Sequence, residues 1–364
     1  MAVANVLTSY YRPKPGGYCK RYYQAINALL GQGAVVHYLA VEKYPIEHDQ
    51  CIFHQFPWPK NRTENLLFWL CFHFLAPFIL LYLGYRYKIT HAFAFGTTYA
   101  FVLQPLKILK RIPLSLFLRG DAIAGHRIKG KSWWVIKLDQ LFEGLAIQGV
   151  GLYGVSDALS QTVLKRHVFF KPAHHGTLRN NLDSFVAGFK AECDEPLTIG
   201  SVGILEKTKN QQLLIQCLAG LPAQKVKLIF YGIGPDKNKL FELGKVLGVS
   251  EQIEFKGWVV SETIWPEIDM LAMPSLYEGA PNAVLEALSN RVPVLASDIP
   301  AHSEILPPES LVSGQSVNAW QEKIMTFIAN PSLRGELQKL QERVSDKLIF
   351  NWGNKISSLI LEGC

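Results

Sequence analysis

The chain has 364 residues, which is longer than one common domain and suits two. Hydrophobic residues make up 49 % and charged residues 18 %, a composition that can bury sizeable cores and argues against extensive disorder. The net charge of +7 is uneven, because residues 1–170 hold 19 Lys and Arg against 8 Asp and Glu, and the remainder holds 18 against 22. A basic first half indicates an anionic partner. Since no long basic run or recognition motif is present, we expect a lipid surface or a phosphorylated substrate and no nucleic acid.

Six cysteines are scattered along the chain without a C-x-x-C pair or metal-ligand spacing. This pattern predicts free thiols in a reducing compartment and no metal site. The first residues contain no basic segment followed by a long apolar core, so we expect no signal peptide and a cytoplasmic protein.

The chain opens with a predicted strand, glycine-bearing loop, helix and second strand over residues 5–41. Gly16 and Gly17 end the loop and would let the backbone approach a ligand, with the amides of the next helix directed at it. Most Gly-Gly pairs are simple turns, so this signal is weak by itself.

Residues 66–83 are almost continuously apolar, with a length close to the roughly 20 residues that span a bilayer. Three interpretations are open. The segment is a buried core helix, or it lies in a membrane interface with Arg62, Arg86 and Lys88 at lipid headgroups, or it spans the membrane. We weigh the span least, because it would disrupt the α/β domain whose predicted strands flank it. The second interpretation predicts peripheral contact with an anionic membrane, at the inner face of the plasma membrane.

Residues 88–95 and 113–118 are predicted strands, and the second runs into Arg119 and Asp121. A position at a strand's carboxyl end makes both residues candidates for a catalytic site, and a buried structural ion pair is an equal alternative. His126 follows in a basic, loop-like stretch and is a candidate for the acceptor side.

Residues 152–158 predict a strand that enters a helix capped by Ser156. The following segment, 170–181, is expected to be a loop at the domain junction. Its histidines, His174 and His175, are not a predicted metal pair, because adjacent side chains diverge in most backbones.

The second half restarts the alternation of strands and helices, with predicted strands at 197–202, 225–231, 253–255 and 270–273. Alternation in both halves predicts an α/β fold of two doubly wound sheets with a cleft between their strand ends. We expect an N-terminal domain over 1–179 and a C-terminal domain over 180–345, with a helix at about 346–364 that packs back on the first domain.

The loop after the predicted strand 270–273 holds the most informative residues. Glu278 lies in it, and Pro281 with Asn282 suits a helix start. Glu286 lies about one turn inside that helix. Two carboxylates, backbone amides and a helix N-terminus suit the binding of hydroxyls and an anion. On these residues alone, the interpretation that Glu278 and Glu286 are ordinary surface carboxylates carries equal weight.

Four segments carry a resemblance to the retaining glycosyltransferases of family 4, namely residues 202–210, 231–235, 255–259 and 274–287, followed by 293–304. The fourth holds two glutamates separated by seven residues, which is the signature of that family. The family has the GT-B architecture of two facing Rossmann-like domains, and the chain looks similar to its bacterial polysaccharide-biosynthesis members. The resemblance covers about residues 150–310, and the first half matches only through its glycine loop and strand order.

The resemblance implies a binding site for a nucleotide diphosphate sugar. Glu278 would lie beside the transferred sugar, Lys209 at the diphosphate, and Glu286 at the ribose hydroxyls. The other implied donor-binding residues are Gly16, Gly17, Gly203, Tyr231, Gly232, Trp258, Val259, Gly279, Ala280, Pro281 and Asn282.

The implied activity is retaining, metal-independent transfer of a hexose to a glycan or lipid-linked saccharide in polysaccharide biosynthesis. A donor of the UDP-glucose type and no cofactor are expected. A lysine and helix amides would stabilise the departing diphosphate. Because no second carboxylate is placed as a nucleophile, the residues favour front-face retention.

Three positions depart from the family pattern. Ile204 stands where arginine is usual beside the lysine, Arg119 replaces a usual histidine, and Arg291 stands where glycine is common. Candidates to replace the missing arginine are Lys207, Lys14 and Arg12. Two alternatives stay open: a sugar-nucleotide epimerase, which would use groups such as Asp121 and His126, and a catalytically degenerate nucleotide-sugar-binding protein.

Overall fold

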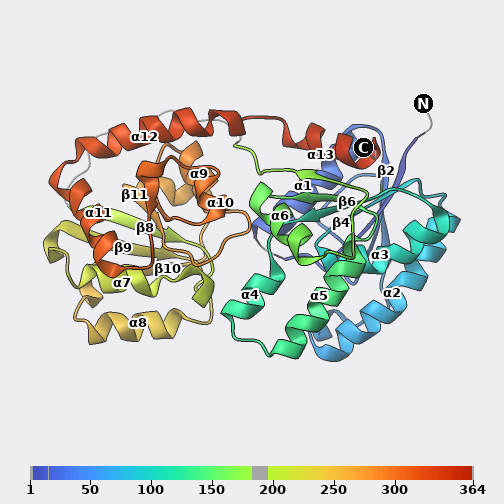
Figure 1. Ribbon diagram of the computed structural model, residues 1–364, viewed down its shortest axis with the longest axis horizontal. Coiled ribbons are helices and arrows are strands. Elements are labelled where there is room, and N and C mark those ends of the chain that lie inside the picture. The colour runs from blue at the N-terminus through green and yellow to red at the C-terminus, as the bar shows by residue number, and fades with distance from the viewer. Residues whose placement is uncertain (1–2, 15, 183–195, 363–364) are drawn as a thin grey trace. The chain divides into compact units, whose positions relative to one another are not determined.

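The computed structural model describes residues 3–14, 16–182 and 196–362 (Figure 1). The chain folds into two compact units. Unit 1 contains residues 1–123, 131–179 and 351–364, and unit 2 contains residues 124–130 and 180–350.

Unit 1 is built on a parallel sheet with the strand order β3-β2-β1-β4-β5-β6-β7 among the described residues. The strands are β1 (Asn5–Ser9), β2 (Val35–Ala40), β3 (Cys51–Gln55), β4 (His91–Phe95), β5 (Leu114–Leu118), β6 (Gly151–Gly154) and β7 (His174–Thr177). The order reverses between β1 and β4, as in doubly wound folds. In such folds, ligands bind at the carboxyl ends of the strands beside the reversal.

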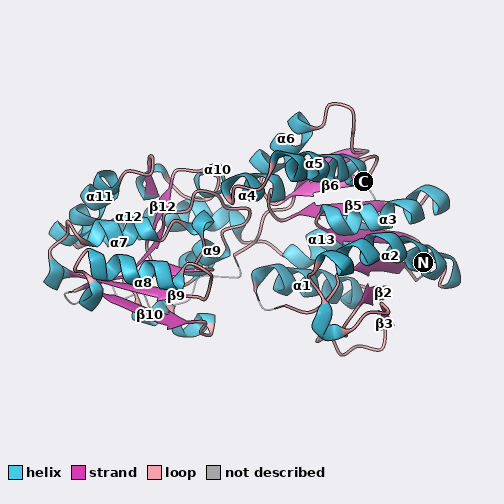
Figure 2. Ribbon diagram, turned by 90° about the horizontal axis from the view of Figure 1, so that it is seen from below, coloured by secondary structure: helices cyan, strands magenta, loops and turns pink. Residues whose placement is uncertain are grey.

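Helices cover both faces of this sheet (Figures 1 and 2). The helices are α1 (Gly17–Gly31), η1 (Lys60–Arg62), α2 (Leu66–Arg86), α3 (Thr97–Lys110), α5 (Trp133–Ile147), α6 (Asp157–Arg166) and α13 (Trp352–Leu361), and α4 (Ala122–Ile128) crosses the division between the units. α13 packs against α1, where Gln32 Nε2 donates to Ser357 Oγ at 2.5 Å. On the opposite face α3 contacts both α2 and α5.

Helix α2 is buried along one stripe only. It begins at the Asn65 cap, whose side chain accepts a hydrogen bond from the Phe68 amide at 2.7 Å. The stripe faces the core of unit 1 and consists of Phe68, Phe72, Ala76, Leu80, Leu83 and Gly84. A core helix would be buried on every side. The core-helix interpretation therefore holds for the buried face of α2 and not for its exposed face.

Two local predictions are wrong in part. The segment expected as a junction loop contains β7, in which His174 pairs with Gly151 of β6. The basic stretch 126–134, expected to be loop-like, is helical at its two ends, because α4 ends at Ile128 and α5 begins at Trp133, and residues 129–132 connect the two helices. Both elements gain their hydrogen bonds or packing from distant segments. For example, Gln104 of α3 donates to the Ala146 carbonyl of α5 at 2.9 Å.

Unit 2 contains a second parallel sheet, in the order β10-β9-β8-β11-β12-β13 among the described residues. Its strands are β8 (Leu197–Val202), β9 (Val226–Tyr231), β10 (Ile253–Gly257), β11 (Met270–Met273), β12 (Val294–Ser297) and β13 (Leu311–Val312). Its helices are α7 (Gln212–Leu218), α8 (Lys237–Val246), α9 (Asn282–Ser289), α10 (Pro300–Ser303), α11 (Val317–Ala329) and α12 (Ser332–Ser345). The short turns are η2 (Lys207–Lys209), η3 (Ala223–Lys225), η4 (Ser250–Gln252), η5 (Ser261–Thr263), η6 (Trp265–Glu267), η7 (Pro308–Ser310) and η8 (Asp346–Leu348).

The strands of unit 2 are buried on both faces, as expected for a parallel sheet. Successive residues of β11 alternate between two hydrophobic clusters: Met270 packs in the cluster of α7 and α11, and Leu271 in the cluster of α9. The strand order again reverses, between β8 and β11. The predicted α/β architecture of two doubly wound sheets is confirmed.

Candidate functional site

The loops after β8 and β9 touch through their backbones. Gly203 and Gly232 both have φ of +144°, a conformation that residues with a Cβ rarely adopt. A Cβ on Gly232 would lie 1.9 Å from the Gly203 carbonyl oxygen. Because this contact tolerates no side chain, the two glycines shape the end of the sheet where the strand order reverses.

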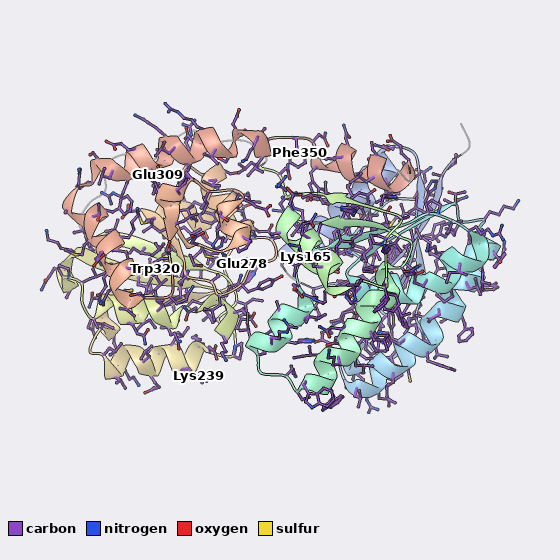
Figure 3. All side chains as sticks on the ribbon, in the orientation of Figure 1. Lys165, Lys239, Glu278, Glu309, Trp320 and Phe350 are labelled. Carbon is purple, nitrogen blue, oxygen red and sulfur yellow. The ribbon has the colours of Figure 1, made fainter. Side chains whose placement is uncertain are left out.

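A buried ion pair joins the loops after β8 and β11. The Lys209 Nζ, at the end of η2, lies 2.5 Å from the Glu278 Oε1. Glu278 (labelled in Figure 3) is 9 % exposed and also accepts a hydrogen bond from Ser275 Oγ at 2.8 Å. The backbones are joined as well, since the Leu276 amide donates to the Thr208 carbonyl at 2.9 Å. The structure thus brings together the two residues predicted to act at the sugar and the diphosphate.

His302 of α10 is a buried member of this site that the sequence analysis did not select. It is fully buried, and its Nδ1 lies 2.8 Å from the Ser297 carbonyl oxygen. Since a carbonyl can only accept, Nδ1 carries the proton, and Nε2 is buried without a hydrogen-bond partner. Burial lowers the pKa of His302, and the negative charge of Glu278 partly opposes that shift. No local sequence pattern marks this residue, because its significance lies in what surrounds it.

Glu286 belongs to a different part of the site from Glu278. It lies on α9 and accepts a hydrogen bond from Ser261 Oγ, which in turn accepts one from Trp265 Nε1 at 3.2 Å. Both partners follow β10. Glu286 therefore faces the β10 side of unit 2, and Glu278 faces the β8 side.

The predicted base-binding residues differ in accessibility. Trp258, directly after β10, is 66 % exposed. Tyr231 is buried, and its hydroxyl donates to Glu267 Oε2 at 2.8 Å. Burial and the Glu267 carboxylate raise the pKa of Tyr231. Val259 packs partly against the core beside α9. Trp258 is thus available to a ligand through its side chain, whereas the Tyr231 side chain is buried.

The segment Gly279–Asn282 leads into α9 as predicted. Pro281 occupies the cap position, no side chain caps the helix, and Asn282 is its first residue. The Asn282 Oδ1 instead accepts a hydrogen bond from Asn180 Nδ2 at 2.5 Å. The partial positive charge of this N-terminus lies next to Glu278 in sequence and suits an anion.

The predicted residues of the glycine loop and β5 lie in unit 1. Gly16, with φ of +119°, caps α1, and Gly17 is the first helical residue. Arg119 follows β5, with its guanidinium 6.0 Å from the centre of the Phe95 ring. Burial and the charge of Arg21 lower the pKa of Arg119 to about 9.

Asp121 belongs to a buried ion pair, and His126 lies on α4. Asp121 is buried and forms an ion pair with Arg166, which also contacts Glu143 Oε2 at 2.7 Å. These contacts favour the structural alternative for Asp121. His126 lies in the part of α4 that belongs to unit 2.

Two of the candidates to replace the missing arginine are engaged elsewhere. Arg12 and Lys14 both contact Glu64 of unit 1, at 2.5 and 3.1 Å. Lys207 is exposed, and Ile204 is itself 57 % exposed. Within the described ranges, no group of three or more His, Cys, Asp or Glu could hold a metal ion.

Comparison with known proteins shows which fold the chain has and which family model matches the region that carries the ion pair. Residues 188–344 match the family described as Glycosyl transferases group 1. This region makes up most of unit 2.

The O-antigen biosynthesis glycosyltransferase WclY of Escherichia coli is 32 % identical over 113 residues, or 31 % of each chain. Matches to the curated relatives span between 29 % and 42 % of those proteins' own length. Among solved structures, WaaG, a glycosyltransferase involved in lipopolysaccharide biosynthesis, has a TM-score of 0.75, 15 % identity and 99 % coverage of both chains. HepE of Anabaena, in complex with UDP-glucose, has a TM-score of 0.76, 15 % identity and 98 % coverage of both chains. The chain thus has the GT-B fold.

We predict that a double-mutant cycle on Lys209 and Glu278 gives the coupling free energy of a buried ion pair. Lys209→Met should destabilise unit 2 by about 3 kcal/mol, because it leaves a buried carboxylate without its cation. The double variant Lys209→Met/Glu278→Gln should be more stable than the sum of the single changes predicts. Urea unfolding of the full chain at neutral pH measures these differences.

The matched control is the exposed pair Lys227–Glu254, whose charged atoms lie 2.7 Å apart. Lys227→Met/Glu254→Gln should show a coupling below about 1 kcal/mol. Equal coupling in the two pairs would contradict the buried-pair assignment.

We also predict that His302 titrates below the ordinary histidine pKa of about 6.5. Glu278→Gln should lower its pKa further, because the carboxylate that favours the protonated ring is gone. NMR titration of the ring nitrogens measures both effects and identifies the Nδ1-protonated tautomer. Glu254→Gln serves as a control that should leave the His302 pKa unchanged. A pKa at or above 6.5, or one that does not respond to Glu278→Gln, would disprove the assignment.

Proposed function

We propose that the protein is a retaining glycosyltransferase that moves a hexose from a nucleotide diphosphate sugar to a glycan or lipid-linked saccharide. The observation that carries this proposal is the buried Lys209–Glu278 pair at the strand ends where the order of unit 2 reverses. The group 1 family match over residues 188–344 supports it. Relatives named for O-antigen and lipopolysaccharide core biosynthesis support a role in polysaccharide assembly.

The donor is proposed to be UDP-glucose or a similar sugar nucleotide. The resemblance in fold to HepE, which was solved with UDP-glucose, supports this choice. In our proposal the exposed Trp258 stacks on the base, and Glu286 accepts hydrogen bonds from the ribose hydroxyls. Glu286 and the Trp258 loop both lie on the β10 side of unit 2, consistent with a single nucleoside site.

In the proposed chemical step, the diphosphate of the donor competes with Glu278 for the Lys209 ammonium, which neutralises Glu278 in this structure. A bound diphosphate would draw the ammonium toward its own charge and release the carboxylate to the sugar hydroxyls and the positive anomeric carbon. Amides at the start of α9 would share the phosphate charge. We propose front-face retention, in which the leaving phosphate takes the acceptor's proton and no metal is needed, because Glu278 is engaged with Lys209 and is not held ready as a nucleophile.

Unit 1 is proposed to select the acceptor. We also propose a cytoplasmic location with peripheral contact to the inner face of the plasma membrane, because the basic residues are concentrated in the first half. The comparisons favour a transferase over a sugar-nucleotide epimerase. A degenerate binding protein would take up the nucleotide sugar without turning it over.

We predict that Glu278→Gln and Lys209→Ala each lower transfer or hydrolysis of a radiolabelled nucleotide sugar by about 10²- to 10³-fold. Lys227→Ala, at an exposed lysine of the same unit, is the control and should retain activity. Full turnover in either site variant would contradict the proposed roles of Glu278 and Lys209. An NMR spectrum of the product that shows inversion at the anomeric carbon would exclude retention.

We further predict that a UDP-sugar raises the melting temperature of the protein. At 100 times its dissociation constant a ligand adds about 2.7 kcal/mol of stability. A thermal-shift series over nucleotide sugars should therefore rank the base and the sugar. Trp258→Ala should reduce the shift for every donor, whereas Val246→Ala, an exposed position on α8, should not. No shift with any nucleotide sugar would contradict the proposed donor class.

A further inference from the structure

The outward face of α2 is apolar along its whole length. From Leu66 to Tyr85 the helix contains no charged residue. Its exposed side chains recur every three or four residues and form one continuous stripe: Leu67, Leu70, Phe74, Phe78, Tyr82 and Tyr85. Phe74 at its centre is 69 % exposed. The surface helix of a soluble domain usually carries polar residues on its outward side. An exposed apolar stripe of this kind marks a surface that binds a partner.

Helix α5 extends the same face. The His73 ring of α2 lies 6.1 Å from the Phe142 ring of α5, so the two helices approach each other at this point, and α3 contacts both of them. Apart from Lys137, the exposed residues of α5 are again apolar, namely Trp133, Trp134, Leu138, Leu141, Phe142 and Leu145. Its Glu143 is buried and contacts Arg166 and His167, so this carboxylate lies away from the exposed face. We call the α2 stripe and these α5 residues the docking face.

The surroundings of the docking face are basic. Between residues 60 and 111, one acidic residue, Glu64, stands against the seven basic residues Lys60, Arg62, Arg86, Lys88, Lys107, Lys110 and Arg111. Glu64 is neutralised by Arg12 and Lys14. Lys110 and Lys107 tie the end of α3 to its neighbours, through the Gly84 carbonyl at 2.8 Å and the Gln148 carbonyl at 2.9 Å. Arg62 and Arg86 stand at opposite ends of α2.

We propose that the docking face inserts into the interface of an anionic lipid bilayer, with α2 and α5 lying along the membrane plane. Apolar side chains would enter the boundary between headgroups and acyl chains, and flanking Lys and Arg would meet the lipid phosphates. Tyr82, Tyr85 and the two tryptophans of α5 have the amphipathic rings that gather at membrane interfaces.

A bilayer suits this face better than a second copy of the chain or a span. A second copy would bring two basic rims together, whereas an anionic surface neutralises them. A span would expose the Phe68–Leu83 stripe to lipid and remove it from the core of unit 1, where the Phe72 ring lies 5.1 Å from the Phe56 ring. The inference gives the membrane contact of the proposed function a defined surface, and its test needs no transferase activity.

The test is flotation of the full chain with vesicles of phosphatidylcholine, with and without phosphatidylglycerol. Binding should require phosphatidylglycerol and weaken as salt rises from low to physiological concentration. Phe74→Glu/Phe78→Glu should lower the partition coefficient by more than about tenfold, because two apolar side chains become anionic. The matched control is Phe241→Glu/Val246→Glu, which adds the same charge to exposed apolar positions on α8 and should bind like the wild type.

A second measurement locates α5 without relying on a disruptive variant. Brominated lipids should quench part of the tryptophan fluorescence of the bound protein. Trp133→Phe/Trp134→Phe preserves apolar rings, so it should bind normally and lose that part of the quenching.

The proposal is overturned if the wild type ignores phosphatidylglycerol vesicles or if the two double-glutamate variants bind equally. Unchanged quenching in the phenylalanine variant removes α5 from the face. A lipid-free dimer, seen by analytical ultracentrifugation and abolished by Phe74→Glu/Phe78→Glu, would assign the face to a second copy instead. Loss of transferase activity in a variant that still binds vesicles would bear on the proposed function alone.

Discussion

The reversal of strand order between β8 and β11 is the constraint on which the site in unit 2 depends. It sends two neighbouring strands into loops that leave the sheet on opposite sides but start next to each other. Gly203 and Gly232 allow the adjoining backbones to touch, and the Leu276 amide ties the two loops together. Only within that frame can Lys209 and Glu278, 69 positions apart, form a short ion pair.

Charge and burial are balanced around that pair. A buried carboxylate is stable only with a cation and hydrogen-bond donors, which Lys209 and Ser275 supply. Burial lowers the pKa of His302 and so disfavours a competing positive charge there, although Glu278 and the Ser297 carbonyl act in the opposite direction. In the proposed complex, the Lys209 ammonium is the cation beside Glu278 that would bind a phosphate. The same lysine would then stabilise the folded chain and bind the ligand.

Unit 1 uses its hydrophobic residues differently. Its core is built from stripes such as Phe68, Phe72 and Ala76, yet the other face of α2 is equally apolar. Folding alone does not require that second face, because exposed aromatic side chains add no stability to a monomer in water. The excess of basic residues in the same half of the chain gives the two features a common explanation at an anionic surface.

By itself, the sequence determined the class of the fold and the positions of most strands. The apolar run Met270–Met273 and the Ser156 cap are local signals, because burial on both faces and capping leave a pattern within a few residues. Tertiary structure decided which charges meet. Asp121 pairs with Arg166 across 45 positions, and Trp133 begins a helix whose packing depends on α3. The same distant contacts decided that Tyr231 is buried, that His302 joins the site, and that α2 is half core and half surface. These contacts depend on how segments that are far apart in the sequence pack together. A local sequence pattern does not show which remote segments will meet.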